Sequence, residues 1–304
     1  MTIVETTSGP VEGRDKEGSL LFAGIPYAAP PTGARRFKAA EPHDAWTEVR
    51  AATRFGPAAP QRATGGLTAA TEVRWSEDCL TLNIATPAAD GKRRPVLFWI
   101  HGGGYRTGQG AIPWYAGGRF ATRGDIVVVS INYRLGALGF TDLSHLGPEF
   151  ATSGVNGLND QIAALEWVRD NVERFGGDPA KITIAGESAG GFAVSTLLAS
   201  PVAKGLFRAA IPQSGAAQHT LPKAAGELCA EKLMGALGQT TAEGLQAASV
   251  EDILDAQARV SDEVGEGAGT MSTFGVAVGA FYPVEGNDVV PRPPLAALAD
   301  GVSS

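Results

Sequence analysis

Residues 186–190 read Gly186-Glu187-Ser188-Ala189-Gly190, the pattern G-x-S-x-G, between an apolar run and a helix-like run. The apolar run at residues 182–185 favours a strand, whereas residues 191–198 favour a helix. A strand, a sharp turn with a serine at its apex and a helix together expose a hydroxyl above the edge of a sheet. Small residues beside the serine let the strand and the helix approach closely. The helix N-terminus favours developing negative charge, so we predict that Ser188 is a nucleophile.

A glycine-rich loop is the second informative feature, and after the apolar run at residues 96–100 it reads His101-Gly102-Gly103-Gly104. Three glycines after a buried strand leave backbone N–H groups free to hold a tetrahedral oxyanion. A phosphate-binding loop is the alternative, but no G-K-[ST] follows and the spacing does not fit G-x-G-x-x-G. In a chain with 40 glycines the G-x-S-x-G pattern alone is weak evidence, and the glycine loop strengthens it.

The remaining hydrophobic pattern favours an α/β fold in a single domain over residues 1–304. Unbroken apolar runs at residues 96–100 and 126–131 are typical of parallel strands that are buried on both faces. Apolar residues recur with helical spacing between Asn159 and Phe175. Further strands are expected at residues 3–6, 11–13 and 208–212, and further helices at residues 221–237 and 250–260. Alternating strands and helices predict a mostly parallel sheet with flanking helices.

The composition argues against several classes of protein. The 304 residues are 44% hydrophobic and 19% charged, which is typical of a globular protein. A net charge of -7 without a basic cluster argues against nucleic-acid binding. The N-terminus lacks a signal-peptide pattern, and no apolar segment is long enough to cross a bilayer, so no membrane association is expected. Two cysteines, Cys79 and Cys229, favour a reducing compartment over a disulfide framework, and we therefore expect a cytoplasmic protein.

Several further motifs accompany the elbow and the glycine loop. They are FAGIPYA at residues 22–28, SEDCLTLN at 76–83, INYRLG at 131–136, the L-x-D-Q-x-A-A element at 158–164, FGGDP at 175–179 and FYPV at 281–284. In combination these motifs resemble the type-B carboxylesterase/lipase family of α/β-hydrolases, which includes cholinesterases and bacterial p-nitrobenzyl-type esterases. The resemblance covers nearly the whole chain and implies an α/β-hydrolase fold.

The resemblance implies a role for each residue of the predicted site. Ser188 would form the acyl-enzyme, and the backbone N–H groups of Gly103, Gly104 and Ala189 would form the oxyanion hole. No metal or organic cofactor is implied. Apart from the resemblance, the carboxylate of Glu187 beside the nucleophile would either stabilise a passing cation or tune the site, or serve as a structural hydrogen-bond acceptor, and these alternatives stay open.

The resemblance also implies structural roles outside the nucleophile and the oxyanion hole. Arg36 would pair with Glu77, and Ser214 would be a polar group near the catalytic triad. Cys79 stands where secreted relatives form a disulfide, but the expected partner position near Ala59 carries no cysteine, which fits an intracellular protein.

The chain departs from the family in its catalytic triad. In this fold the triad runs Ser, then Asp or Glu, then His along the chain. His219 is the only histidine after Ser188, and no Asp or Glu lies between them. Because His219 is close in sequence to Ser214, a substitute role for it is the alternative. His101 belongs to the glycine loop, His43 lies in a proline-containing N-terminal loop, and His145 lies in a polar connection. We therefore expect the triad acid and histidine to come from residues outside this sequence, together with the last strands and helices of the fold.

These expectations define a function and an alternative. The expected function is hydrolysis of carboxylic esters of modest size, with a complementing C-terminal chain as a possible partner that completes the activity. The alternative is a non-catalytic cholinesterase-like binding module. Retention of Ser188 and of the glycine loop argues against that alternative, because such modules usually lose the nucleophile.

Overall fold

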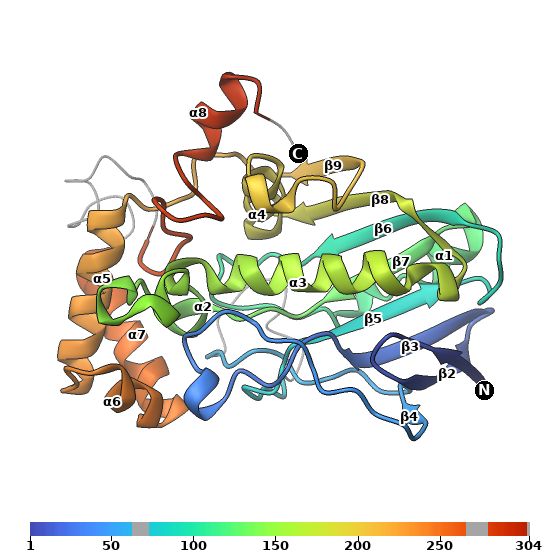
Figure 1. The fold of residues 1–304 in the computed structure, drawn as a ribbon, viewed down its shortest axis with the longest axis horizontal. Helices are drawn as coiled ribbons and strands as arrows, with labels where there is room; N and C mark the ends of the chain where they lie inside the picture. The colour runs from blue at the N-terminus through green and yellow to red at the C-terminus, as the bar shows by residue number, and fades with distance from the viewer. Residues whose placement is uncertain (63–72, 266–278, 303–304) are drawn as a thin grey trace.

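The apolar runs of the sequence form one mixed sheet in a computed structural model that describes residues 1–62, 73–265 and 279–302 (Figure 1). The strands are β1 (Thr2–Glu5), β2 (Pro10–Lys16), β3 (Ser19–Pro26), β4 (Arg50–Ala51), β5 (Thr81–Thr86), β6 (Arg94–Ile100), β7 (Val127–Ile131), β8 (Gly177–Glu187) and β9 (Ala209–Gln213). Their order in the sheet is β1-β2-β3-β5-β7-β6-β8-β9, and β4 pairs with β2.

The sheet has an antiparallel half and a parallel half. Strands β1, β2, β3, β5 and β7 pair antiparallel in that order, whereas β7, β6, β8 and β9 pair in parallel. The apolar runs predicted as buried parallel strands are β6 and β7, with Val96 opposite Val127. The predicted α/β class is confirmed, and the parallel pairing within this path is confined to the half that carries the predicted site.

Helices follow most strands of the parallel half. They are α1 (Gly118–Gly124), α2 (Gly136–Phe140), α3 (Asn156–Asn171), α4 (Ala189–Leu198), α5 (Lys223–Leu237), α6 (Ala242–Ala247), α7 (Val250–Val264) and α8 (Pro294–Ala299). Short 3-10 helices occupy Gly33–Arg35, Pro113–Tyr115, Ser144–Leu146, Pro148–Phe150, Ser153–Val155, Val172–Phe175 and Pro201–Ala203. The helices predicted around residues 159–175, 191–198, 221–237 and 250–260 are confirmed as α3 with its 3-10 extension, α4, α5 and α7. The Ser249 side chain caps α7 by accepting a hydrogen bond from the Asp252 N–H at 3.0 Å.

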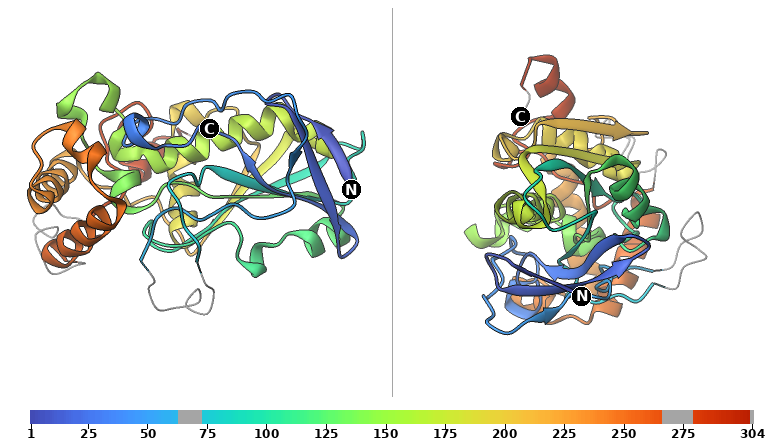
Figure 2. Two further views of the ribbon diagram at one scale, coloured as in Figure 1. Left: turned by 90° about the horizontal axis from the view of Figure 1, so that it is seen from below. Right: turned by 90° about the vertical axis from the view of Figure 1, so that its right-hand side faces the viewer.

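The main hydrophobic core lies on one face of the sheet. Alternate residues of β6, namely Val96, Phe98 and Ile100, are buried there with residues of α3 and α4. The opposite face is covered by α1 over β3, β5 and β7, where Ala85, Ala121 and Val128 form a small second cluster. The right-hand view of Figure 2 shows α1 and α3 on opposite sides of the sheet.

The outer edge of β9 carries no further strand among the described residues. Four of the five β9 residues are exposed, and the Ile211 side chain is 45% exposed. This geometry agrees with the expectation of an unpaired edge next to the predicted site. Within the described ranges, no helix combines the length and the hydropathy needed to cross a bilayer.

Candidate active site

Ser188 lies in the sharp turn between β8 and α4. Its backbone has φ 54 and ψ -122, a conformation that is strained for a residue with a side chain. Two hydrogen bonds hold the turn: the Ser188 N–H donates to the Gln213 carbonyl at 2.9 Å, and the Phe192 N–H donates to the Ser188 carbonyl at 2.9 Å. The turn that the sequence predicted is therefore present, with the serine at its apex and half-exposed.

Glycine is required at both ends of the turn because backbone atoms pack against it. A Cβ atom added at Gly190 would lie 2.1 Å from the Ile100 carbonyl oxygen, and one at Gly186 would lie 2.5 Å from the Gly190 carbonyl carbon. A Cβ atom at Gly102 would lie 3.3 Å from the Ser188 Cβ. The same close packing thus brings the glycine loop after β6 against the predicted nucleophile.

The glycine loop turns its backbone outward beside Ser188. Gly103 and Gly104 have φ values of 115 and 62, and a Cβ atom at Gly103 would lie 2.2 Å from the Thr107 carbonyl oxygen. The Gly103 carbonyl accepts hydrogen bonds from the Arg106 and Thr107 N–H groups, both at 3.0 Å. Among the described residues, no acceptor is assigned to the N–H groups of Gly103, Gly104 or Ala189. Ala189 is the first residue of α4, where the N–H groups have no partner within the helix.

His101 anchors the loop and is held neutral. Its ring stacks on Tyr133 with 4.4 Å between centroids, and the Tyr133 hydroxyl donates to the His101 carbonyl at 2.8 Å. Burial lowers the pKa of His101 to about 4, because the charged imidazolium would lose its hydration. His43 packs edge-on against Trp46, and His145 is exposed. His101 and His43 lie in loops, as predicted, whereas His145 lies in the short 3-10 helix Ser144–Leu146.

His219 lies near the elbow but is not placed as its base. The imidazole stacks on Phe192 with 3.5 Å between centroids and 3° between ring planes. Its Nδ1 lies 3.3 Å from the Ala216 carbonyl oxygen. No hydrogen bond between His219 and Ser188 is present in the described part of the chain, so the structure does not bring the two together as nucleophile and base.

Glu187 extends from the end of β8 into solvent beside Ser188. The pKa of the Tyr115 hydroxyl is raised, mainly by burial and secondly by the nearby negative charge of the Glu187 carboxylate. Oε2 of Glu187 would lie 3.1 Å from a Cβ atom at Gly102, which places the carboxylate along the glycine loop. Both alternatives for Glu187, a contact with a substrate cation and a structural acceptor, are compatible with this position.

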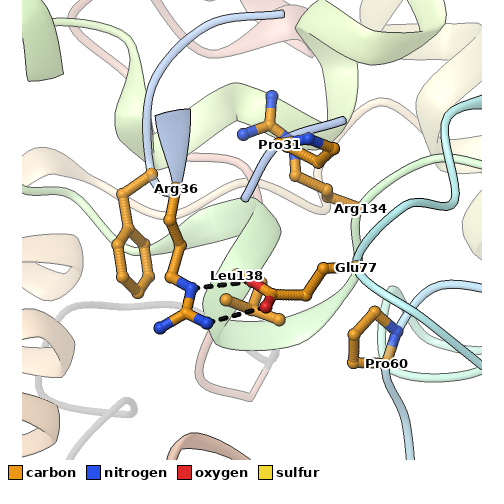
Figure 3. Close-up of a pocket in the computed structure, with 7 residues that line it drawn as sticks. Pro31, Arg36, Pro60, Glu77, Arg134 and Leu138 are labelled. Carbon is orange, nitrogen blue, oxygen red and sulfur yellow. Dashed lines mark hydrogen bonds and ion pairs between the residues drawn. The ribbon is translucent and has the colours of Figure 1, made fainter. Parts of the chain in front are cut away.

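The predicted ion pair between Arg36 and Glu77 is present and is bidentate (Figure 3). Nε and Nη2 of Arg36 donate to the two carboxylate oxygens, each at 2.7 Å. Nη1 donates to the carbonyls of Gln246 at 2.8 Å and Ala248 at 2.6 Å. The pair therefore connects the N-terminal region to the end of α6 and has a structural role.

The sequence analysis did not identify a second buried pair, Arg134 and Asp160. Nη2 and Nε of Arg134 donate to the two Asp160 oxygens at 2.6 and 2.8 Å, and both side chains are buried. Arg134 and the Arg36–Glu77 pair line one cavity of about 10 Å³, which is room for roughly a single water (Figure 3). The sequence did contain a signal for this pair, because Arg134 lies in the N-Y-R-L-G motif and Asp160 is the aspartate of the L-x-D-Q-x-A-A motif.

The other predicted site positions are also located. Ser214 is exposed at the end of β9, with φ 48, directly after the residue whose carbonyl holds Ser188. Cys79 and Cys229 are both free and buried, and burial raises the pKa of the Cys229 thiol to about 11. Among the described residues, no cluster of three His, Cys, Asp or Glu side chains is placed to hold a metal ion.

Comparison with known proteins finds a single family across the chain. The family model described as "Carboxylesterase family" matches residues 1–303. Phenmedipham hydrolase of Pseudarthrobacter oxydans is 42% identical over 305 residues, covering 98% of this chain and 59% of the relative. Para-nitrobenzyl esterase of Bacillus subtilis is 40% identical over 304 residues, covering 99% of this chain and 60% of the relative.

Solved structures show the same similarity in three dimensions. A carboxylesterase of Geobacillus stearothermophilus superposes with a TM-score of 0.88 at 43% identity, covering 100% of this chain and 60% of the other. The chain thus spans about 60% of the length of the curated relatives that it matches.

Proposed function

Because this chain belongs to the carboxylesterase family and has its α/β-hydrolase fold, we propose that it supplies the nucleophile and the oxyanion hole of an enzyme that hydrolyses carboxylic esters. One observation carries the proposal: the strained turn at Ser188 packs directly against the glycine loop, with only 3.3 Å from a Cβ position at Gly102 to the Ser188 Cβ. A nucleophile and free backbone donors on either side of one point are what acyl transfer requires.

In the proposed reaction the Ser188 hydroxyl oxygen attacks the ester carbonyl carbon while a base removes the hydroxyl proton. The resulting oxyanion accepts hydrogen bonds from the N–H groups of Gly103, Gly104 and Ala189. Collapse of this intermediate breaks the bond to the alcohol, which takes up the proton and leaves an acyl-serine. Water then attacks the acyl-serine by the same route and releases the carboxylic acid.

The base and its carboxylate are proposed to come from a completing segment, meaning polypeptide of this protein or of a second chain that carries the triad acid and histidine. Two observations on the described residues support this: His219 makes no hydrogen bond with Ser188, and no strand pairs with the outer edge of β9 beside the elbow. The Gln213 carbonyl at the end of β9 holds the Ser188 N–H at 2.9 Å. A strand added in parallel to β9 would therefore end close to Ser188.

A groove next to β9 supports the same proposal. It has a volume of about 310 Å³ and is lined mostly by apolar side chains: Leu97, Trp99, Trp114, Tyr115, Phe120 and Ile211. Trp114 and Phe120 are 65% and 61% exposed, and Nε1 of Trp99 is buried without a partner in the described part of the chain. Parallel strands are normally covered on both faces. We assign this groove to a helix of the completing segment that packs beside α1.

The test uses a serine-directed fluorophosphonate, with mass spectrometry to locate the modified residue. The probe for the completing segment is the part of the Bacillus subtilis para-nitrobenzyl esterase outside its match to this chain. Labelling of Ser188 in the mixture, absent in Ser188→Ala, is expected. Formation of a complex with no labelling of Ser188 would overturn the proposal and favour a non-catalytic binding module. The names of the relatives, which describe a hydrolase and an esterase, do not favour such a module.

The substrates are proposed by analogy with these relatives. Their printed names concern phenmedipham and para-nitrobenzyl compounds, and we propose carboxylic esters of modest size for this chain, with neutral esters as the default class. We further propose that Glu187 contacts a positively charged part of those substrates that carry one. Butyrylcholine and its uncharged isostere 3,3-dimethylbutyl butyrate test this role. In the complemented protein, Glu187→Gln is expected to lower the ratio of kcat/KM for butyrylcholine to that for the uncharged ester about fivefold. An unchanged ratio would favour the structural role of Glu187 over contact with a cation.

We also infer a reducing, cytoplasmic location and no nucleic-acid partner. Both cysteines of the chain are free and buried, and the net charge is -7. Thiol titration of the protein isolated from its native cells under alkylating conditions tests the location. Two alkylated thiols per unfolded chain are expected, and a disulfide would contradict the inference.

A further inference from the structure

A second groove lies on the face of the sheet that carries α1. It has a volume of about 470 Å³, and none of its lining residues belongs to the turn at Ser188 or to the glycine loop. Its side-chain walls are aromatic rings and charged groups, namely Phe55, Trp114, Phe120, Lys16, Glu17 and Arg119. We propose that this groove, called the hairpin groove below, binds a small aromatic carboxylate. The proposal goes beyond ester hydrolysis and does not depend on it.

The hairpin groove is built on backbone that is held in place. One wall is the turn between β2 and β3, where the Ser19 hydroxyl donates to the Lys16 carbonyl at 2.8 Å. The start of α1 packs on the same hydroxyl, because a Cβ atom at Gly118 would lie 2.9 Å from the Ser19 Oγ. A Cβ atom at Gly117 would lie 2.9 Å from the Val128 Cγ1, so the connection into α1 is pressed onto the sheet. The left view of Figure 2 shows α1 beside this turn. Such a preformed groove lowers the entropic cost of binding a ligand.

The aromatic side chains of the hairpin groove give it an apolar surface open to solvent. Trp114 and Phe120 are mostly exposed, and adjacent exposed apolar groups of this size mark binding sites. The Lys16 Nζ lies 5.7 Å from the centroid of the Phe55 ring, which is the geometry of a cation–π contact. A positive charge is thus held at the border of the apolar surface, where the polar end of a ligand would lie.

The charged side chains of the hairpin groove select the ligand. Lys16 and Arg119 are cations and Glu17 is a carboxylate, so the lining carries a net charge of +1 in a chain whose net charge is -7. Within the described residues the Arg119 guanidinium makes no hydrogen bond or ion pair, and its planar donors match the two oxygens of a carboxylate. The volume lies in the range of about 300–1,000 Å³ that is usual for sites of small molecules. A monocarboxylate on a ring system of one or two rings fits both the charge and the aromatic walls.

The test compares 2-naphthoate with its uncharged analogue 2-naphthamide on the 304-residue chain. Nuclear magnetic resonance titration gives both dissociation constants, and the indole N–H signal of Trp114, assigned by its loss in Trp114→Phe, locates the ligand. The carboxylate is expected to bind about fivefold more tightly at low salt, which is the usual worth of one exposed ion pair, and the ratio should fall at high salt. Equal binding of the two compounds, or a Trp114 signal that does not shift, would overturn the proposal. Ser188→Ala should leave both constants unchanged, and weaker binding there would place the ligand at the turn instead.

Charge variants assign the preference to the hairpin groove. Lys16→Gln and Arg119→Gln are each expected to weaken 2-naphthoate binding about threefold and to leave 2-naphthamide binding unchanged. Glu17→Gln should act in the opposite direction and strengthen 2-naphthoate binding about threefold. Lys204→Gln is the matched control, because Lys204 is an exposed cation that does not line the groove. Unchanged binding in the Lys16 and Arg119 variants, or an equal loss in the control, would overturn the proposal.

The completing segment is the competing occupant, because the hairpin groove meets the groove next to β9 at Trp114 and Phe120. Lys16 and Arg119 line the hairpin groove and not the groove next to β9. The dissociation constant of 2-naphthoate is therefore expected to stay the same when the completing segment is added. Loss of 2-naphthoate binding on its addition would overturn the proposal and assign the hairpin groove to the interface between the two polypeptides.

Discussion

The carboxyl ends of β6 and β8 and the outer edge of β9 are neighbours in one sheet, yet they differ in how complete they are. At β6 and β8 the turn that carries Ser188 and the glycine loop, which we propose as nucleophile and oxyanion hole, are closely packed against each other. At β9, by contrast, the outer edge of the strand is unpaired and the adjacent apolar groove is uncovered among the described residues. The difference shows that local backbone geometry is enough to build the turn at Ser188 and the glycine loop, whereas we propose that the completing segment supplies the rest of the site.

The complete region should tolerate little change, and its largest expected effect is at a buried ion pair. Asp160→Ala leaves the buried Arg134 guanidinium without its carboxylate, which typically costs about 3–5 kcal/mol of unfolding free energy. The exposed pair of Arg62 and Asp255 is the matched control, and Asp255→Ala should cost at most about 1 kcal/mol. Urea unfolding measures both, and equal losses would contradict the contrast between buried and exposed pairs.

The oxyanion loop gives the next largest effect. Gly103→Ala places a Cβ atom 2.2 Å from the Thr107 carbonyl oxygen and strains a backbone with φ 115, so the loop must move. Loss of an oxyanion donor typically lowers the rate about 10²–10³-fold. The labelling rate of Ser188 by the fluorophosphonate in the complemented protein should fall by this order. Gly91→Ala has open space around the new Cβ and serves as the control, and a similar loss there would argue against the assignment.

His101 makes the complete region sensitive to acid. Its pKa is about 4 in the folded protein and about 6.5 in an unfolded chain, so the unfolded state binds more protons between these values. The stability that His101 contributes is therefore present above pH 6.5 and is lost as the pH falls toward 4, by up to about 3 kcal/mol. Unfolding of His101→Gln at several pH values checks this, and an unchanged slope between pH 4 and 6.5 would contradict it.

A substitution at the exposed β9 edge should change stability less than the substitutions above and should reduce association of the chain. Ile211→Lys puts a charge on the bare β9 edge, which is expected to reduce self-association of the isolated chain without lowering its stability by more than about 0.5 kcal/mol. Affinity for the completing segment should fall about tenfold. Val202, with a similar exposure of 43% against 45%, is the matched control. Sedimentation measures both effects, and equal behaviour of Val202→Lys would argue against a role for the β9 edge.

The sequence predicted the complete region well because local pattern determines it. The elbow, the glycine loop, β6, β7 and α3 each follow from consecutive residues or from one period. Strands β3 and β5 were not identified, since they belong to the antiparallel half and their pairing is set by contacts far along the chain. The short helix α1 contains glycines at both ends and gives little helical signal.

Side-chain constellations were the part that sequence alone could not supply. Arg36 and Glu77 could be paired only through the family resemblance, and Arg134 and Asp160, 26 positions apart, were not paired at all. The stack of Phe192 on His219 depends on how the loop after β9 packs against α4. Such contacts need the assembled sheet, because no short-range pattern specifies them.

We propose that Ser188 is positioned for acyl transfer and that, among the described residues, no histidine is placed as its base. The most direct test is turnover of p-nitrophenyl butyrate by the soluble 304-residue protein beside its Ser188→Ala variant. The account predicts no multiple turnover in either protein until the completing segment is added. Multiple turnover by the 304-residue protein alone, abolished by Ser188→Ala, would show that a base is present in this chain and would contradict the account.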